Sequence, residues 1–211
     1  MTTDPKTIDA TAEFDRQVAN LEPAVPDAGR LGALVAPLRD VAAGLGAVEV
    51  DAAAGRIPFV LVVTRNVVPI EESMPRTTLH GKKKPGFVDR SFEPGSLERF
   101  TAVEELPDPD AYLLLDVERG EEFCGEVPND AMDVIAKRER TLLTIEEGIA
   151  LVTHFPEVLV KNKCFSLGGS RCGDRRVPAI WISQNAPKLG WCWAGNPHTW
   201  LGMASGGARR A

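Results

Sequence analysis

The pattern of apolar and polar residues predicts two helices at the start of the chain. Phe14, Val18 and Leu21 recur at helical spacing, so one face of the first helix is apolar. A second apolar stripe of the same kind runs through residues 28–43. Residues 1–12 have no periodic apolar positions, and we expect them to form a disordered tail. The N-terminal part of the chain therefore predicts two helices that pack on a core.

The middle of the chain predicts two buried strands and two further helices. Residues 57–63 (IPFVLVV) and 111–117 (AYLLLDV) are apolar without alternation, which is typical of strands covered on both faces. Residues 66–107 between them are rich in Pro and Gly, and a loop of this length is usually either disordered or functional. Helices are predicted over 129–138 and 144–154, the second opened by the capping box T-I-E-E.

The last quarter of the chain predicts strands. Four short extended runs, separated by Gly, Pro, Asn and Asp, occupy residues 164–167, 177–183, 188–193 and 199–203. Regular short spacing of this kind indicates an antiparallel meander. We expect one α+β domain over 13–206, with the N-terminal helices packed on a mixed or antiparallel sheet and the β-meander at the C-terminal end. Residues 207–211 are expected to form a second disordered tail.

Composition narrows the class of protein. The chain has 211 residues, of which 44% are hydrophobic and 26% charged, and this is enough to bury a core. The sequence has no apolar run approaching the roughly 20 residues that cross a bilayer, and its start lacks the layout of a signal peptide. Four cysteines are too few for a disulfide scaffold. We expect a cytoplasmic protein that does not associate with a membrane.

Charge is distributed unevenly along the chain. The net charge is -6, which argues against non-specific nucleic-acid binding by the protein as a whole. From Lys161 onward, eight Lys and Arg residues face one acid, Asp174, so this segment carries +7 and the preceding 160 residues carry -13. All four tryptophans lie in the same segment. The working surface is therefore expected near the C-terminus.

Catalytic candidates cluster in the turn GSRCGDRRVP at residues 169–178. Arginines on both sides of Cys172 should favour its thiolate, which makes this thiol the best nucleophile candidate in the chain. His198 follows a turn signal and is the best candidate base. Asp174 could orient a histidine or pair with an arginine. A carboxylate from the strand end at 116–122 is a further candidate acid or base.

The same cysteines allow two alternatives to catalysis. Cys164, Cys172, Cys192 and His198 form a possible Cys₃His zinc set, although their spacing lacks the paired C-x₂-C element. The cysteines can also be small buried residues, which is the usual role of thiols in strands. We therefore assign no metal site.

Binding candidates interleave cations with aromatic rings. Guanidinium groups bind phosphate or carboxylate bidentately, and indoles stack on planar rings. The candidate substrate-binding residues are Arg171, Arg175, Trp181, Trp193 and Asn196. Tryptophans at alternate positions also occur in plain cores, and we expect at least two of the four to be core residues. A small anionic or aromatic molecule is the ligand that this composition predicts, and no cofactor is indicated.

Several runs of the sequence resemble an uncharacterised actinobacterial protein family. They are YLLLDVERGEEF, TIEEGIALVTHFPEVL, RCGDRRVPAIWIS and APKLGWCWAGNPHTWLG, and the likeness extends from about residue 57 to the C-terminus. The resemblance implies a bacterial cytoplasmic protein and carries over no activity or site residue. The motifs GxxxxGK[ST], GxSxG, HExxH and GxGxxG are absent.

Two functions follow as expectations. The first is an enzyme that processes an anionic or aromatic metabolite in a basic, Trp-lined C-terminal pocket through Cys172, His198 and Asp174. The second is a non-catalytic binding protein for a metabolite, a partner protein or a nucleic acid. If the candidate binding residues open into one concavity, both expectations stand.

Overall fold

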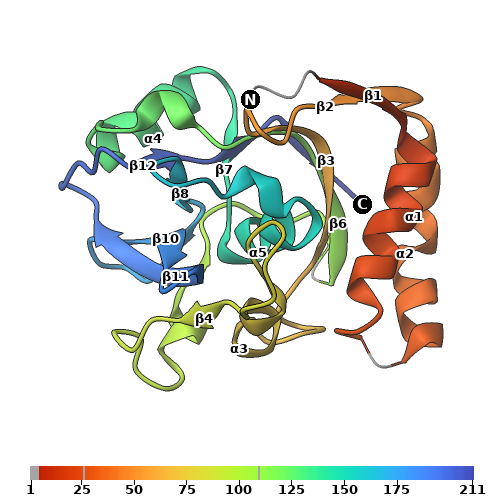
Figure 1. Cartoon of the computed structure of the whole chain (residues 1–211), viewed down its shortest axis with the longest axis horizontal. Coiled ribbons are helices and arrows are strands. Elements are labelled where there is room, and N and C mark those ends of the chain that lie inside the picture. The colour runs from red at the N-terminus through yellow and green to blue at the C-terminus, as the bar shows by residue number, and fades with distance from the viewer. Residues whose placement is uncertain (1–4, 26, 109) are drawn as a thin grey trace.

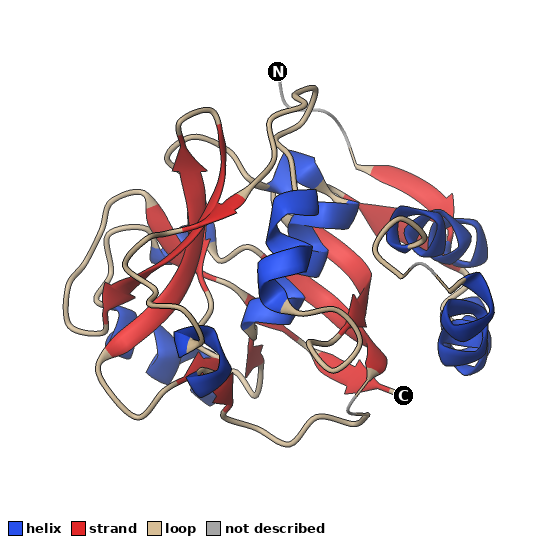
Figure 2. Cartoon of the chain, turned by 90° about the horizontal axis from the view of Figure 1, so that it is seen from below, coloured by secondary structure: helices blue, strands red, loops and turns tan. Residues whose placement is uncertain are grey.

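The computed structural model describes residues 5–25, 27–108 and 110–211. Its elements form successive layers in the order helices, sheet, helix, sheet (Figures 1 and 2). The expected α+β class is confirmed. The residues predicted as two N-terminal helices form α1 (Ala10–Leu21) and α2 (Ala28–Ala43), which lie together at one side of the molecule.

The start of the chain is ordered earlier than the sequence suggested. β1 (Lys6–Asp9) pairs antiparallel with β2 (Ala47–Val50), and the Asp9 side chain accepts a hydrogen bond from the Ala12 backbone to cap α1. The expected tail over 1–12 is therefore wrong for residues 6–12. Its first four residues lie outside the described part of the chain. A strand with mostly exposed side chains has no apolar pattern by which it could be recognised.

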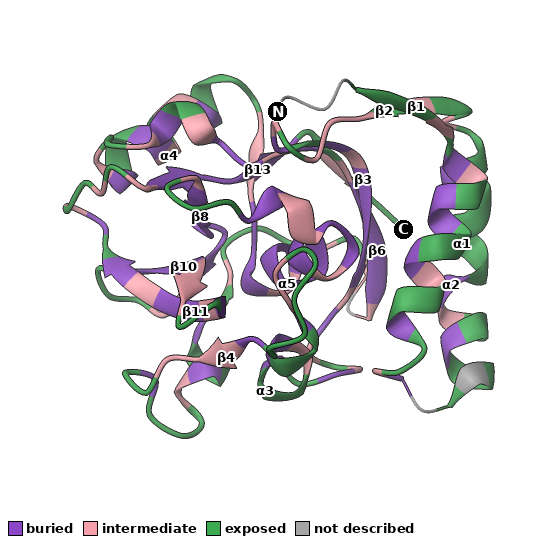
Figure 3. Ribbon diagram, in the orientation of Figure 1, coloured by how far each residue is buried: buried purple, intermediate pink, exposed green. Residues whose placement is uncertain are grey.

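The central sheet is built on the two predicted buried strands. β3 (Arg56–Val63) and β6 (Ala111–Glu118) pair antiparallel along most of their length. Phe59 and Leu61 pack toward α1 and α2, whereas Val60 and Val62 pack into the larger core on the other side. Both faces are buried, as the unbroken apolar runs predicted (Figure 3).

Short strands extend this sheet. They are β7 (Thr141–Leu142), β13 (Ser205–Gly206) and β14 (Ala208–Arg210), in the order β14-β6-β13-β7. The expected tail over 207–211 is therefore wrong, since β14 pairs with β6. Arg209 anchors it by donating to both carboxylate oxygens of the fully buried Glu147 at 2.6 and 3.1 Å. Tertiary contact orders a segment that has no apolar pattern of its own.

The second sheet carries most of the predicted C-terminal strands. Its order is β12-β8-β10-β11-β4, and its strands are β4 (Phe87–Val88), β8 (Cys164–Ser166), β10 (Arg176–Ser183), β11 (Ala186–Trp193) and β12 (Leu201–Met203). β10 and β11 form a hairpin whose two loop residues, Gln184 and Asn185, have φ of 52° and 60°. β12 does not continue the expected meander, because it pairs in parallel with β8 at the opposite side.

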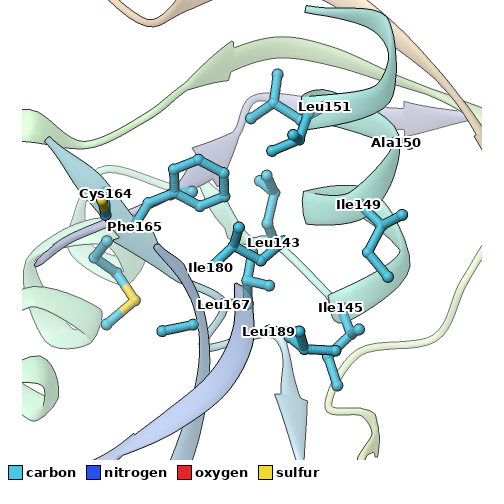
Figure 4. Close-up of a cluster of buried hydrophobic side chains, with 14 of the residues drawn as sticks. Leu143, Ile145, Ile149, Ala150, Leu151, Cys164, Phe165, Leu167, Ile180 and Leu189 are labelled. Atoms are coloured by element: carbon cyan, nitrogen blue, oxygen red, sulfur yellow. The ribbon is translucent and has the colours of Figure 1, made fainter. Parts of the chain in front are cut away.

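Helix α5 (Ile145–His154) lies between the two sheets. The predicted capping box is present, with Thr144 and Glu147 bonding each other's backbone. Gly148 of α5 packs against Leu167 beside the second sheet, where a Cβ atom would come within 2.4 Å of that side chain, and Figure 4 shows Leu151 of the helix extending toward Phe165 of β8. The core is therefore continuous from β6 through α5 to β10.

The remaining elements cover the edges. α4 (Pro128–Lys137) corresponds to the helix predicted over 129–138. The long segment 66–107 contains α3 (Ile70–Ser73), β4, short 3₁₀ turns and β5 (Thr101–Ala102), which pairs with β9 (Ser170–Arg171). It is an ordered strap across the sheet and not a structureless loop.

Candidate functional site

The predicted cluster of arginines around Cys172 lies at the start of β10 in the second sheet. We call residues 171–176, which connect β9 to β10, the arginine turn. Gly173 has φ of 81°, a conformation that glycine adopts without strain, and this lets the turn reverse in a few residues. The turn contains three arginines and one acid, so its net charge is +2.

Asp174 and Arg176 hold the turn in shape. The Asp174 carboxylate accepts hydrogen bonds from the Arg176 backbone and from Arg176 Nε, both at 2.8 Å. Partial desolvation raises the pKa of Asp174, but the hydrogen bonds from the Arg176 backbone, from the Cys172 thiol and from the Arg176 side chain outweigh it and leave the pKa below its ordinary value. The Arg176 guanidinium carbon lies 5.3 Å from the centre of the Phe100 ring and 5.6 Å from that of Trp191. Asp174 is therefore committed to an arginine and does not orient a histidine.

Arg171 and Arg175 have no carboxylate partner within the described part of the chain. Arg171 donates to the Asp174 backbone oxygen at 3.0 Å and contacts the Met132 sulfur at 3.8 Å, and its Nε is buried without an acceptor. Arg175 is exposed, and its guanidinium lies over Gly195. These two guanidinium groups retain donors for an anion.

Trp193 and Asn196 lie at the same end of the hairpin. Trp193 pairs with Arg176 across the strands, is 44% exposed, and packs edge to face on Trp191 at 4.8 Å. Asn196 is exposed and its backbone N–H donates to the Trp193 oxygen. The exposed indole lies at the same end of the hairpin as two guanidinium groups that lack a carboxylate partner, and such a combination is suited to a ligand that is both planar and anionic.

Trp181 does not belong to this cluster. It pairs with Lys188, whose Nζ lies 5.0 Å from the indole centre, and this register places Trp181 on the opposite face of the hairpin from Trp193. Gly190 lies beneath the Trp181 ring, where a Cβ atom would come within 2.0 Å of it. The expected single pocket lined by both Trp181 and Trp193 is therefore wrong.

His198 is also on the Trp181 side. Its ring lies 5.3 Å from Trp200, which in turn packs on Trp181 at 5.8 Å. Cys172, in contrast, accepts a hydrogen bond from Arg176 Nη2 at 3.6 Å. Among the described residues no hydrogen bond joins Cys172 to His198, so the expected nucleophile and base do not form a pair in this structure.

The alternative zinc set is not assembled either. No group of three or more His, Cys, Asp and Glu side chains that could hold a metal ion occurs in the described ranges. Cys164 and Cys192 are buried, and burial raises the pKa of both thiols. They pack as small apolar side chains in the strands, which was the second alternative to catalysis for these cysteines.

Sequence reasoning missed a cavity that lies away from the arginine turn. It has a volume of about 310 Å³ and is lined by the end of α1, by α3 and by α5, with Arg76 among its wall residues. Three segments far apart in the sequence form this wall, within residues 20–24, 63–76 and 146–153, and none of them carries a motif. No local signal could have revealed it.

Comparison with known families agrees with the long C-terminal runs. A model of the family of unknown function DUF5701 matches residues 24–211. The chain belongs to this family. The match confirms the expected resemblance to an uncharacterised family and extends it toward the N-terminus to include α2. No curated protein and no solved structure matched the chain.

The DUF5701 match covers β10, β11 and the arginine turn, so these are features of the family region of the chain. It supplies no activity, and the chemistry of the turn therefore has to be argued from its residues. In the described part of the chain, no helix is both long and apolar enough to span a bilayer.

Proposed function

We propose that this protein binds a small organic anion at the arginine turn. Arg171 and Arg175 hold the anionic group, and Trp193 covers the planar part of the ligand. The observation that carries the proposal is that these two guanidinium groups have no carboxylate partner among the described residues, although the chain as a whole has an excess of acids. Unpaired cations on an acidic protein are available for an external anion.

The chemistry of the turn favours phosphate or carboxylate. A guanidinium group donates two parallel hydrogen bonds to either group, and such charge-assisted bonds are roughly twice as strong as neutral ones. The Asp174 carboxylate does not compete, because Arg176 occupies both of its oxygens. The exposed face of Trp193 offers stacking to an aromatic ring, which is worth about 1–3 kcal/mol per base in nucleic-acid complexes.

Binding is proposed in preference to turnover because the expected catalytic groups have other partners. Cys172 contacts Arg176, and His198 packs against Trp200. An enzyme that uses Cys172 as a nucleophile would need a free base within hydrogen-bond reach, and the Asp174 carboxylate beside the thiol accepts from Arg176 on both of its oxygens. A metabolite fits the small basic turn better than a nucleic acid does, since the net charge of the whole chain is -6.

A bacterial cytoplasmic setting is part of the same proposal. All four cysteines are free thiols, and Cys124 and Cys172 are only partly buried. Unpaired, accessible thiols are typical of proteins from reducing compartments.

Calorimetric titration with phenyl phosphate tests the proposed function, because this probe combines one anionic group with one aromatic ring. We expect saturable binding of one molecule per chain. Arg175→Ala should weaken it roughly 10- to 150-fold, since a hydrogen bond to a charged group contributes roughly 1.5–3 kcal/mol. Trp193→Ala should weaken the binding of phenyl phosphate more than it weakens the binding of inorganic phosphate.

Arg90→Ala is the matched control, because Arg90 is an exposed arginine outside the turn. It should bind phenyl phosphate as the unaltered protein does. Equal losses in Arg90→Ala and Arg175→Ala would mean that the probe senses overall charge, and the proposal would then be wrong. Unaltered binding by Arg175→Ala and Trp193→Ala would also contradict it.

A further inference from the structure

A second place in the molecule has the properties of a ligand site and shares no residue with the arginine turn. The cavity of about 310 Å³ lies where the end of α1, α3 and α5 meet over the end of β3. In Figure 1 these elements converge between the N-terminal helices and the central helix. Its volume is at the lower end of the range of about 300–1,000 Å³ that is typical of small-molecule sites.

The wall of the cavity is mainly apolar. Hydrocarbon surface comes from three separate segments, through Leu21, Val68, Ile70, Ile149 and Ala150. Each of these side chains is buried, yet together they leave a space that the helices do not fill. An apolar cavity of this kind binds apolar groups and excludes ordered water.

Most polar groups of the wall are already satisfied. The Ser73 hydroxyl donates to the backbone oxygens of Val68 and Pro69, and the Thr153 hydroxyl donates to Ile149. These hydroxyl groups bond to backbone within the wall. They do not select a polar ligand.

One charged residue of the wall, Arg76, has no ion pair among the described residues. Glu146 is ion-paired with Arg65, which also donates to the Leu97 backbone oxygen, so this carboxylate is neutralised. The Arg76 side chain is exposed. Arg76 and Glu146 are the charged wall residues, and because Arg65 outside the wall neutralises Glu146, the Arg76 guanidinium group is the charge left at the edge of the apolar space.

We propose that this cavity binds a monocarboxylate with an apolar body, whose carboxylate is held by Arg76. The two parallel donors of a guanidinium group match the two oxygens of a carboxylate. A water molecule takes about 30 Å³ in the liquid, so the cavity holds roughly ten non-hydrogen atoms. This size corresponds to a medium-chain fatty acid or a small aryl-substituted acid.

Titration calorimetry with octanoate, octan-1-ol and octylamine tests the proposal, because these probes share one chain length and differ in charge. Octanoate should bind at least tenfold more tightly than octan-1-ol, and octylamine should bind least. Arg76→Ala should remove this preference, so that octanoate binds at least tenfold more weakly while octan-1-ol binding changes less than twofold. Arg90→Ala is the control and should keep the preference.

Cavity filling tests the location. Ala150→Leu and Ala24→Leu each add bulk to the wall from a different segment. At least one of the two variants should fold and show the unfolding transition of the unaltered protein. A folded variant of either kind should lose octanoate binding at least tenfold. Octanoate binding that survives in a folded filling variant would overturn the proposal, and so would equal affinity for octanoate and octan-1-ol.

The two proposed sites can fail separately. Arg175→Ala should leave octanoate binding unchanged, and Arg76→Ala should leave phenyl phosphate binding unchanged. Loss of octanoate binding in Arg175→Ala would place the octanoate site at the arginine turn and would overturn the cavity proposal.

Discussion

At the scale of single residues, His154 is a titratable group that the fold shields almost completely from water. Its side chain is 1% exposed, and Nε2 lies 2.9 Å from the Leu61 backbone oxygen. A carbonyl oxygen only accepts, so Nε2 carries the proton and Nδ1 accepts from the Asn20 amide at 3.4 Å. Burial lowers the pKa of His154 to about 3, and the ring is therefore neutral in the folded protein at neutral pH.

Because His154 is buried in its neutral form, the protein should lose stability in mild acid. The folded pKa lies below the unfolded value of about 6.5, so below that pH the unfolded chain binds a proton that the folded chain does not. The free energy of unfolding should then fall by up to about 1.4 kcal/mol per pH unit from pH 6.5 down toward 3. Urea unfolding of His154→Gln at pH 7, 6, 5 and 4 should lack this component of the slope. His80→Gln is the exposed control and should keep it, and an unchanged slope in His154→Gln would refute the assignment.

At the scale of elements, the C-terminal strand is held by one buried ion pair. Glu147 has no exposed surface and accepts from Tyr112, Arg209 and the Thr144 backbone. Only the Arg209 guanidinium group among these donors balances its charge. β14 is thus attached to α5 through Arg209, in addition to its ladder with β6.

Removing that guanidinium group should be costly. Arg209→Ala leaves the Glu147 carboxylate buried without a counter-charge, and breaking a buried pair in this way typically costs about 3–5 kcal/mol. Arg210→Ala, one residue away and exposed, should change the free energy of unfolding by less than about 0.5 kcal/mol. Urea denaturation measures both. Similar losses in the two variants would show that β14 is held by its backbone ladder and not by the ion pair.

The elements also show where sequence patterns were sufficient. β3 and α5 were predicted because their signals are local, an unbroken apolar run in one and a capping box in the other. β1 and β14 were missed because their side chains are mostly polar or partly exposed. Long-range pairing decides such strands, and a pattern along the chain does not record it.

The site was predicted in part for the same reason. The arginine turn is a local cluster, so its residues could be found by reading the sequence. The placement of Trp181 depends on the register of the hairpin, which the two-residue loop at Gln184 and Asn185 fixes. A change of one residue in the loop would move Trp181 to the face of Trp193. The sequence alone did not settle that length.

At the scale of the whole molecule, the β10–β11 hairpin presents two faces with different residues. Trp193 and the arginine turn form the proposed anion site, while Trp181, Trp200 and His198 pack together on the other side. The net charge of -6 makes the +2 turn a local exception on an acidic protein. An anion that binds the arginine turn should change the environment of Trp193 and leave that of Trp181 and Trp200 unchanged.

The four indole N–H groups therefore provide the most direct test. Two-dimensional ¹H–¹⁵N NMR during titration with phenyl phosphate reports on each tryptophan separately. We expect saturable shifts at the Trp193 indole and at the backbone amides of residues 171–176, with the Trp181 and Trp200 indoles unchanged. Shifts centred on Trp181 and Trp200, or no saturable shift at Trp193, would contradict the proposed binding site.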